Sequence, residues 1–416
     1  MDDVLRCSNG FSFCLSIGNN RLVMAILLAF NSLLLLSCQA QKDENYSLNT
    51  KDISFNNSLG SKGAQVSVAD SGHYVIKLSS APDHENWPNM AQFTIYNATG
   101  SSPVVEVLFD NENTRYNFND YFYSWSYDQV HWNPIHWENG PEHSKNRDRL
   151  IFPKFERDTV FVGHQVPFSY PVMEKHISSW ARHPSVTIKV IGHSTHGKKI
   201  YRVSIQGKDL NNDPWVHYYA NQHPGEHNAQ WRMTGMINYL LQEDNKYRKK
   251  SINHFVLMAS PDSPENGWYR VNAEGVDMNR GYLTEGADSS LQSHETYLLQ
   301  KDFESLMNSE FSPHTAWAMH TWEGKVEIWM VPGSEVGIEV GEWDVFRKIL
   351  LENDSYNLFD TLQNRASQNK GSWGNGPYKQ FGVTTFLCEG GGNLYTKEKN
   401  VQSGKILMQS IEEYYD

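Results

Sequence analysis

The stretch HPGEHNAQW, from His223 to Trp231, follows an apolar and aromatic run from Trp215 to Ala220. The run predicts a strand, Pro224 and Gly225 predict a tight turn, and Glu226 is expected to open a helix. The turn brings an imidazole and a carboxylate together, and these are nitrogen and oxygen donors that zinc binds at about 2.0–2.2 Å. A strand, a turn with two donors and a helix often place chemistry at the carboxyl end of a strand. A histidine before a Pro-Gly turn is more often an ordinary loop residue, so this motif needs support from the rest of the chain.

Length and composition indicate a large folded protein. The 416 residues favour two domains or one large domain with insertions, and 39% hydrophobic residues supply an ample core. The formal net charge of −12 argues against nucleic acid as a partner but does not identify a substrate. Of the four cysteines, only Cys388 lies outside the N-terminal region, so we expect no internal disulfide in the mature chain. Nothing in the sequence indicates an oligomeric state.

Residues 1–37 are predicted to be a signal peptide. The apolar run Val23–Leu36 is too short for a comfortable membrane span and fits the core of a secretory signal. It ends in Leu35-Leu36-Ser37-Cys38, which resembles the bacterial lipobox, where the cysteine is lipidated and becomes the mature N-terminus. We therefore expect an exported bacterial lipoprotein that faces the periplasm or the cell surface and contacts the membrane only through lipid on Cys38. Cleavage near Ala40 would instead release a soluble periplasmic or secreted protein.

Three segments follow the signal peptide. Residues 38–63 are polar and predict a flexible tether. Residues 64–170 contain short alternating runs between turn residues and predict an all-β sandwich domain. From 171 to 416, strands alternate with helices, which predicts an α/β domain with a mixed, mainly parallel sheet flanked by helices. Its expected elements are a helix at 171–181, strands at 187–191, 199–203, 255–259 and 383–387, a helix from Glu226 with its apolar residues along one face, and a helix at 404–414.

Four further motifs carry polar side chains at or near predicted strand ends. They are Asn266–Arg270, Gly275–Arg280, His320 after the apolar run 315–319, and Glu389 between the strand 383–388 and three glycines. Each motif alone is a weak signal, because a lone arginine is usually a surface ion pair and a lone glutamate a solvated loop residue. Their common order along the chain makes the set specific.

The five motifs in this order resemble the zinc carboxypeptidase family. The nine-residue step from Arg270 to Asn279 is similar to the cytosolic-carboxypeptidase-type subgroup. That subgroup also places a β-sandwich before its catalytic domain, and Phe161–Tyr170 resembles its junction segment. The resemblance covers about residues 90–400. It implies a carboxypeptidase-like fold with residues 171–416 as the zinc carboxypeptidase catalytic domain.

The resemblance implies a single zinc ion per chain, held by His223, Glu226 and His320. Three protein ligands leave a fourth position for water, as catalytic zinc requires. Zinc acidifies that water and polarises the scissile carbonyl. Glu389 matches the family's general base, which takes the water proton and passes it to the leaving amine. Arg270 matches the arginine that stabilises the developing oxyanion.

Further residues match the family's substrate-binding and supporting positions. Asn279 and Arg280 match the pair that holds the substrate's terminal carboxylate, since a guanidinium binds that planar anion through two parallel hydrogen bonds. Asp277 matches the aspartate that orients a zinc histidine. Tyr378 is a candidate for the family's mobile tyrosine, but its step of 11 residues to Glu389 is shorter than in carboxypeptidase A, so we assign it no role.

The sequence therefore predicts a zinc metallocarboxypeptidase that hydrolyses the last peptide or isopeptide bond of a peptide with a free carboxylate. An alternative enzyme is an N-acyl amino acid deacylase with the same zinc geometry. An alternative of another class is a catalytically inactive surface lipoprotein that binds peptide or glycan. The side-chain specificity is not readable, because the loops between His320 and Glu389 do not align by eye.

Overall fold

The computed structural model describes residues 48–55, 60–78, 90–108, 122–135, 147–208, 210, 213–242, 250–321, 328–332, 340–359, 363–367, 370–392 and 394–416. The chain divides into two compact units, Met1–Tyr46 and Ser47–Asp416, and every described residue lies in the second. The predicted signal peptide and Cys38 lie outside the described residues. None of the described helices combines the length and the apolar character that crossing a membrane requires.

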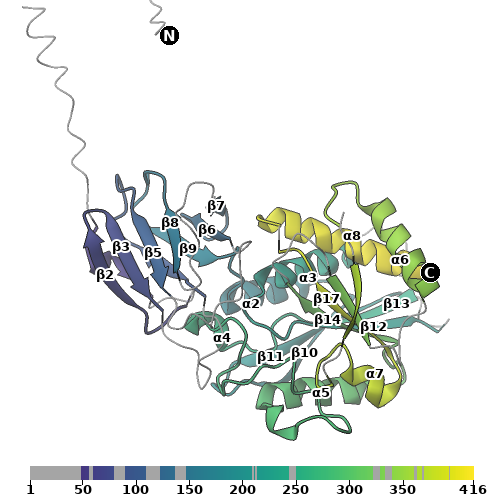
Figure 1. Cartoon of the computed structure of the whole chain (residues 1–416). Coiled ribbons are helices and arrows are strands. Elements are labelled where there is room, and N and C mark those ends of the chain that lie inside the picture. The colour runs from purple at the N-terminus through teal and green to yellow at the C-terminus, as the bar shows by residue number, and fades with distance from the viewer. Residues whose placement is uncertain are drawn as a thin grey trace, which may run out of the picture. The chain divides into compact units, whose positions relative to one another are not determined.

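The first part of the described chain is a β-sandwich (Figure 1). One sheet has five strands in the order β1-β4-β9-β6-β7, and the other has four in the order β2-β3-β5-β8. Both sheets contribute to one apolar core, with Phe93 and Val162 from the first sheet and Ile76 and Val107 from the second. The β-rich region ahead of the α/β part is therefore confirmed. The strands are β1 (Ile53–Ser54), β2 (Gln65–Asp70), β3 (His73–Lys77), β4 (Phe93–Ile95), β5 (Val104–Leu108), β6 (Tyr123–Ser126), β7 (Asn133–Ile135), β8 (Arg147–Ile151) and β9 (Val160–His164).

The sandwich begins earlier in the chain than the sequence predicts. The short helix η1 (Thr50–Asp52) and strand β1 fall within residues 38–63, the predicted tether, and β1 pairs with β4. Leu48, Ile53 and Phe55 bury their side chains in the sandwich core. The tether prediction is therefore wrong for residues 48–55. The sequence predicted a tether because these few apolar residues stand among polar neighbours, so that the local composition is polar.

The second part is built on an eight-stranded mixed sheet in the order β10-β11-β13-β12-β14-β17-β15-β16. Four neighbouring pairs are parallel: β13–β12, β12–β14, β14–β17 and β15–β16. The other three pairs are antiparallel, so the predicted mixed, mainly parallel sheet is confirmed. The strands are β10 (Val186–His193), β11 (Lys199–Gln206), β12 (Trp215–Ala220), β13 (Ser251–Val256), β14 (Thr315–His320), β15 (Ile328–Pro332), β16 (Gln363–Ser367) and β17 (Thr384–Glu389).

Helices cover both faces of this sheet (Figure 1). Helices α3, α6 and α8 pack over one face, into which Tyr219, Trp317 and Phe386 point. Helices α5 and α7 cover the other face, where Tyr218 and Ala316 are buried. Successive residues of one strand therefore enter different cores, as the pleat of a strand requires. The helices are α2 (Tyr170–Trp180), α3 (His227–Leu240), α4 (Ser263–Asn266), η3 (Ser289–Leu291), α5 (His294–Met307), α6 (Val340–Asn353), α7 (Gly376–Phe381) and α8 (Lys397–Tyr415).

Strand β13 differs from its prediction. It spans Ser251–Val256 instead of 255–259, so it begins with polar residues. Ser251 and Asn253 are buried there, and both donate hydrogen bonds to the carboxyl group of Glu412 on α8. An internal hydrogen-bond partner allows polar residues in a central strand, and a search for apolar runs misses such a strand.

Helix α3 starts directly after Glu226, as predicted, but it is not amphipathic in the expected way. Its residues His227–Ile237 are all buried, the polar ones included. The sheet covers one side, α8 covers another, and the sandwich reaches it through Gln92, whose amide nitrogen is 3.3 Å from His227 Nε2. A helix enclosed on several sides does not show the single apolar face that the sequence pattern indicated.

Candidate metal centre

Three strand ends form the base of the candidate site. Strand β12 ends at Ala220, just before the HPGE turn, while β14 ends at His320 and β17 at Glu389. The parallel register pairs Ala220 with Ala318 and His320 with Glu389. Because parallel neighbours end at the same edge of a sheet, side chains far apart in the sequence meet here.

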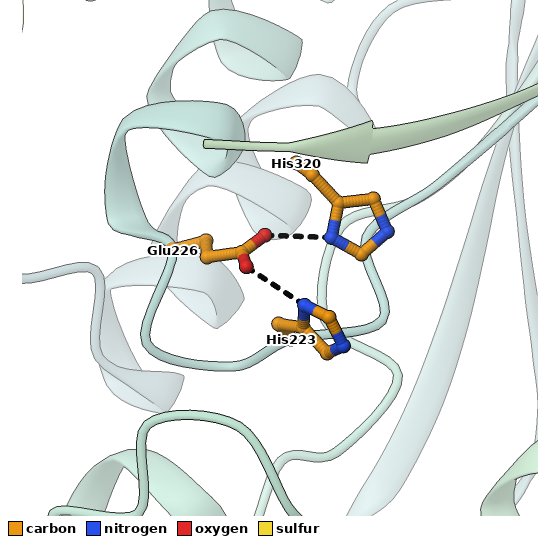
Figure 2. Close-up of side chains that lie close together, drawn as sticks. All are labelled: His223, Glu226 and His320. Carbon is orange, nitrogen blue, oxygen red and sulfur yellow. Dashed lines mark hydrogen bonds and ion pairs between the residues drawn. The ribbon is translucent and has the colours of Figure 1, made fainter. Parts of the chain in front are cut away.

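The HPGE turn depends on Gly225. Its N–H donates to the carbonyl oxygen of Tyr269 at 2.7 Å. A Cβ atom at this position would lie 2.3 Å from the Tyr269 ring and 2.8 Å from that oxygen, so only glycine permits the approach. The N–H of Glu226 donates to the His223 carbonyl oxygen at 3.2 Å. The closed turn thereby directs both side chains to the same side (Figure 2).

His223, Glu226 and His320 form a compact group of possible metal ligands (Figure 2). One donor atom from each lies within 4.8 Å of the others, and all three side chains are buried. Nδ1 of His223 is 2.7 Å from one carboxylate oxygen of Glu226, and Nδ1 of His320 is 2.7 Å from the other. Two imidazole nitrogens and a carboxylate are a donor set that zinc accepts.

The surroundings of His223 fit a bound cation. Its Nε2 is 2.9 Å from Oδ1 of Asp277, as expected for a ring N–H that donates to a carboxylate. Nδ1 then presents a lone pair to the carboxylate of Glu226, and two such groups repel each other unless a proton or a metal ion lies between them. An aspartate behind a ligating histidine is the usual way to fix the ring and increase its basicity. These residues would therefore hold a metal ion through Nδ1 atoms and the Glu226 carboxylate.

Opposite charges compensate within this buried group. Burial alone would raise the pKa of Glu226, but the His223 and His320 rings lower it well below its ordinary value. Burial lowers the pKa of His320 to about 4, although Glu226 acts in the opposite direction. Burial would also raise the pKa of Asp277, and Arg270 and His223 nevertheless hold it well below its usual range. Ionised carboxylates and a neutral His320 are the protonation states that metal ligation needs.

A short hairpin folds Arg270 back against Asp277. Gly275 closes the turn with a φ of 75°, and Val271 and Asp277 form an antiparallel bridge. Nε of Arg270 donates to Oδ2 of Asp277 at 2.6 Å. Since the other oxygen of Asp277 accepts from His223, this carboxylate connects the predicted oxyanion arginine to a predicted metal ligand.

Asn279 and Arg280 follow Asp277 on the same loop. Asn279 is buried, its N–H donates to Oδ1 of Asp277, and its side-chain oxygen accepts from the N–H of Trp373, both at 2.9 Å. Nη1 of Arg280 donates to the Asn279 carbonyl oxygen at 2.9 Å. A guanidinium has several N–H donors, so this bond leaves capacity for an anionic ligand.

Glu389 completes the group. Burial raises its pKa well above its ordinary value, the charge of Glu226 raises it further, and Arg270 and Arg280 oppose the rise. These interactions require the four charged groups to lie near one another. The structure thus brings together all the predicted site residues that it describes: His223, Glu226, Arg270, Asp277, Asn279, Arg280, His320 and Glu389. Their individual roles stay predictions, as does any role for the half-buried Tyr378 on α7.

Sequence reasoning missed two supporting residues. The N–H of Thr321 donates to Oε2 of Glu226 at 3.1 Å, and its Oγ1 accepts from the N–H of Ala229 at 2.9 Å. The carbonyl oxygen of Tyr269 accepts the hydrogen bond from the N–H of Gly225 that is described above. The only signals in the sequence were the positions of Thr321 next to His320 and of Tyr269 next to Arg270.

A family profile described as zinc carboxypeptidase matches residues 173–381. The chain belongs to the zinc carboxypeptidase family. Related sequences include cytosolic carboxypeptidase 2 of Danio rerio, which is 28% identical over 152 residues, or 34% of this chain and 21% of that protein. Cytosolic carboxypeptidase 3 of Bos taurus is 29% identical over 139 residues, or 31% of this chain and 14% of that protein. The match therefore spans about a fifth or less of the length of these relatives.

Solved structures of metallo-carboxypeptidases share the fold. A metallo-carboxypeptidase from Burkholderia cenocepacia superposes with a TM-score of 0.73 at 17% identity, covering 88% of this chain and 98% of that one. A metallo-carboxypeptidase from Pseudomonas aeruginosa, in complex with (2-guanidinoethylmercapto)succinic acid, gives a TM-score of 0.70 at 18% identity, covering 88% and 99%. Likeness at these identities concerns the fold, and it confirms the carboxypeptidase-like α/β fold with a β-rich region before it.

Proposed function

We propose that this chain is an active zinc metallocarboxypeptidase that hydrolyses the C-terminal peptide or isopeptide bond of peptides with a free carboxylate. The observation that carries the proposal is the buried group of His223, Glu226 and His320, with Asp277 behind it and Glu389 in electrostatic contact. Three ligands from two strand ends leave a position open for water, which is the arrangement of catalytic rather than structural zinc.

Zinc bound by these residues would acidify a water molecule and polarise the scissile carbonyl. Glu389 would accept a proton from that water. Burial and the charge of Glu226 raise its pKa, which makes the carboxylate a stronger proton acceptor. In the reaction the water oxygen bonds to the carbonyl carbon, the carbon–nitrogen bond breaks, and Glu389 passes the proton to the leaving amine.

Arg270 supplies positive charge where negative charge develops. Its bond to Asp277 fixes the orientation of the guanidinium. A preoriented donor stabilises the developing oxyanion without reorganising during the reaction, and loss of one such donor typically costs about 10²–10³ in rate. Asp277 thus serves two groups, because it also orients His223.

Arg280 and Asn279 are proposed to bind the terminal carboxylate of the substrate. A guanidinium held beside a buried amide is suited to a planar anion. The Pseudomonas aeruginosa metallo-carboxypeptidase of similar fold is in complex with a succinic acid derivative, a class of compound that carries carboxylates. A carboxylate bound here would place the last peptide bond of the substrate over the metal centre.

The test compares one peptide as its free acid and as its C-terminal amide, with wild type, Arg280→Ala and Arg182→Ala. Arg182 is an exposed arginine whose side chain bonds to Ser179, so its removal is a matched control. Wild type and Arg182→Ala should cleave the acid at least about 10²-fold better, because a guanidinium makes two charge-assisted hydrogen bonds to a carboxylate and each contributes about 1.5–3 kcal/mol. Arg280→Ala should lose most of that preference.

Other outcomes separate the alternatives. Equal cleavage of acid and amide, or cleavage of internal bonds, contradicts the carboxypeptidase proposal. Release of an amino acid from N-acyl amino acids but from no peptide would identify the deacylase. A protein that binds the peptide and releases nothing would be the inactive binding protein.

We also propose that the mature chain is anchored to a bacterial membrane through lipid on Cys38. The support is the sequence Leu35-Leu36-Ser37-Cys38 alone, since these residues lie outside the described part. Metabolic labelling with a fatty acid should label wild type and not Cys38→Ser. Equal labelling of both proteins would contradict the anchor and leave the catalytic proposal untouched.

A further inference from the structure

A cavity of about 430 Å³ lies at the end of the sheet opposite the metal centre. Its walls include the first residues of β12, β14 and β17, namely Trp215, Thr315 and Thr384. The candidate metal ligands lie at or just after the opposite ends of β12 and β14, and Glu389 is at the opposite end of β17. Six residues at about 3.3 Å each separate the two ends by about 20 Å, so the cavity is no extension of the metal site. Its volume falls within the range of about 300–1,000 Å³ that is usual for small-molecule sites.

Aromatic rings from several elements line this cavity. Trp215 and Tyr415 have ring centroids 4.5 Å apart, and Tyr414 lies 4.9 Å from Tyr415 at an interplanar angle of 90°. Phe346 of α6 meets Tyr414 at 5.5 Å and 85°, and Trp343 also lines the wall. Rings inclined to one another in this way give the cavity an aromatic lining, and the face of each ring carries partial negative charge.

Two of the described residues that line the cavity have side chains of opposite chemical character, one acidic and one basic. Glu342, in the first turn of α6, is the acidic residue of the wall. Burial and the charge of Glu342 both raise the pKa of Tyr414, which indicates that the carboxylate lies close to the rings. His314 is the basic residue of the wall. Its Nδ1 lies 3.1 Å from the N–H of Val216, a bond that Nδ1 accepts only when it carries no proton.

The state of His314 follows from that bond. Burial lowers the pKa of His314, with Asp213 acting in the opposite direction, so the ring is neutral at neutral pH. Among the lining residues that the structure describes, Glu342 therefore carries a negative charge and none carries a compensating positive charge. Trp215 is 39% exposed, which leaves the cavity open to solvent on that side.

We propose that this cavity binds a small organic cation, of the quaternary ammonium or alkylammonium class. Such a cation contacts several aromatic faces at once through cation–π attraction and satisfies Glu342 at the rim. An anion would be repelled by the carboxylate of Glu342 and by the faces of the aromatic rings. A neutral apolar molecule would fill the volume but leave the carboxylate without a partner. The site would be separate from the peptide site and independent of zinc.

The experiment compares choline with 3,3-dimethylbutan-1-ol, which has the same shape and no charge. Binding to the full chain is measured by saturation-transfer NMR and calorimetry, with and without added zinc. Choline should bind saturably, at least about 10-fold more tightly than the neutral alcohol. Zinc should not change that affinity.

Two variants and a matched control locate the site. Glu342→Gln should weaken choline binding several-fold, and Tyr414→Leu should weaken it further by removing a ring. Glu352→Gln removes the same charge from the same helix outside the cavity, where Glu352 pairs with Lys348, and should have no effect. All three positions are at least partly exposed, so circular dichroism should show an intact fold.

The other outcomes either overturn the proposal or identify the source of the cation. No saturable choline binding, or equal binding of the neutral alcohol, overturns the proposal. An unchanged affinity in Glu342→Gln also overturns it, because the carboxylate would play no part. Co-sedimentation with phosphatidylcholine vesicles that depends on Glu342 would identify a lipid headgroup as the cation, and choline binding without such sedimentation would identify a free cation.

Discussion

The two ends of the central parallel strands each bury a carboxyl group, and the partners of these two groups differ. At the carboxyl ends, Glu226 is buried between two histidines, which hold its pKa well below its ordinary value. Near the amino end of β13, Glu412 is also buried, but its partners are the neutral side chains of Ser251 and Asn253. Burial raises the pKa of Glu412 to about 7.

The comparison shows that burial does not by itself determine the charge of a carboxyl group. Desolvation penalises the anion of both glutamates, and only partners that carry or accept positive charge reverse the effect. The surroundings of Glu226 therefore favour its anion, which can bind a cation, whereas the surroundings of Glu412 favour the neutral acid. Three variants can break or sharpen this contrast.

The largest effect is expected for the histidines. His320→Ala removes one of the three proposed ligands, so zinc content should fall well below one equivalent and peptidase activity should become undetectable. His217→Ala is the matched control, since His217 is also fully buried on a neighbouring strand but bonds to Thr315 near the other end. It should keep its zinc. Elemental analysis of the purified proteins is the measurement, and full zinc in His320→Ala would refute the ligand assignment.

The next effect is expected for the proposed base. Glu389→Gln keeps the size of the side chain and removes its ability to accept a proton. The value of kcat should fall by about 10²–10⁴-fold, while zinc content and folding stay as in wild type. Glu413→Gln, a charge removal on α8, should leave kcat unchanged. Activity near the wild-type level in Glu389→Gln would mean that the base lies elsewhere.

The smallest effect concerns stability at Glu412. Its folded-state pKa of about 7 lies above the ordinary 4.5, so the folded state keeps a proton that the unfolded state releases between these values. The free energy of unfolding should therefore fall by about 1.4 kcal/mol for each pH unit in this window, or about 3 kcal/mol in all, relative to a group that does not titrate. The contribution is fully present below pH 4.5 and lost as the pH rises through 7.

Glu412→Gln tests this directly, because the amide cannot ionise and can still accept from Ser251. Denaturant unfolding at several pH values should show the variant close to wild type at pH 4.5 and about 3 kcal/mol more stable at pH 8. The difference between the two proteins isolates one group from the buried histidines, which titrate in the opposite sense. Glu413→Gln should show no such difference, and a constant gap across the pH range would exclude titration of Glu412 as its cause.

Much of the site could be predicted from local sequence. The HPGE turn with its proline and glycine, and the strand ends at His320 and Glu389, all follow from residue types and their neighbours. Each of these signals depends on a few consecutive residues, which is the range over which turn chemistry and hydrophobic periodicity act. The order of the motifs then indicated the family.

Tertiary structure alone decided the rest. The pairing of His320 with Glu389 in register, the burial of α3 on several sides, and the bonds that place Ser251 and Asn253 in a central strand join residues distant in sequence. Residues 48–55 belong to the sandwich for the same reason, since a few apolar anchors suffice once partners exist to cover them. Periodicity shows which side chains prefer burial, but burial, pKa and cavities depend on which distant surfaces meet, and only the folded chain determines that.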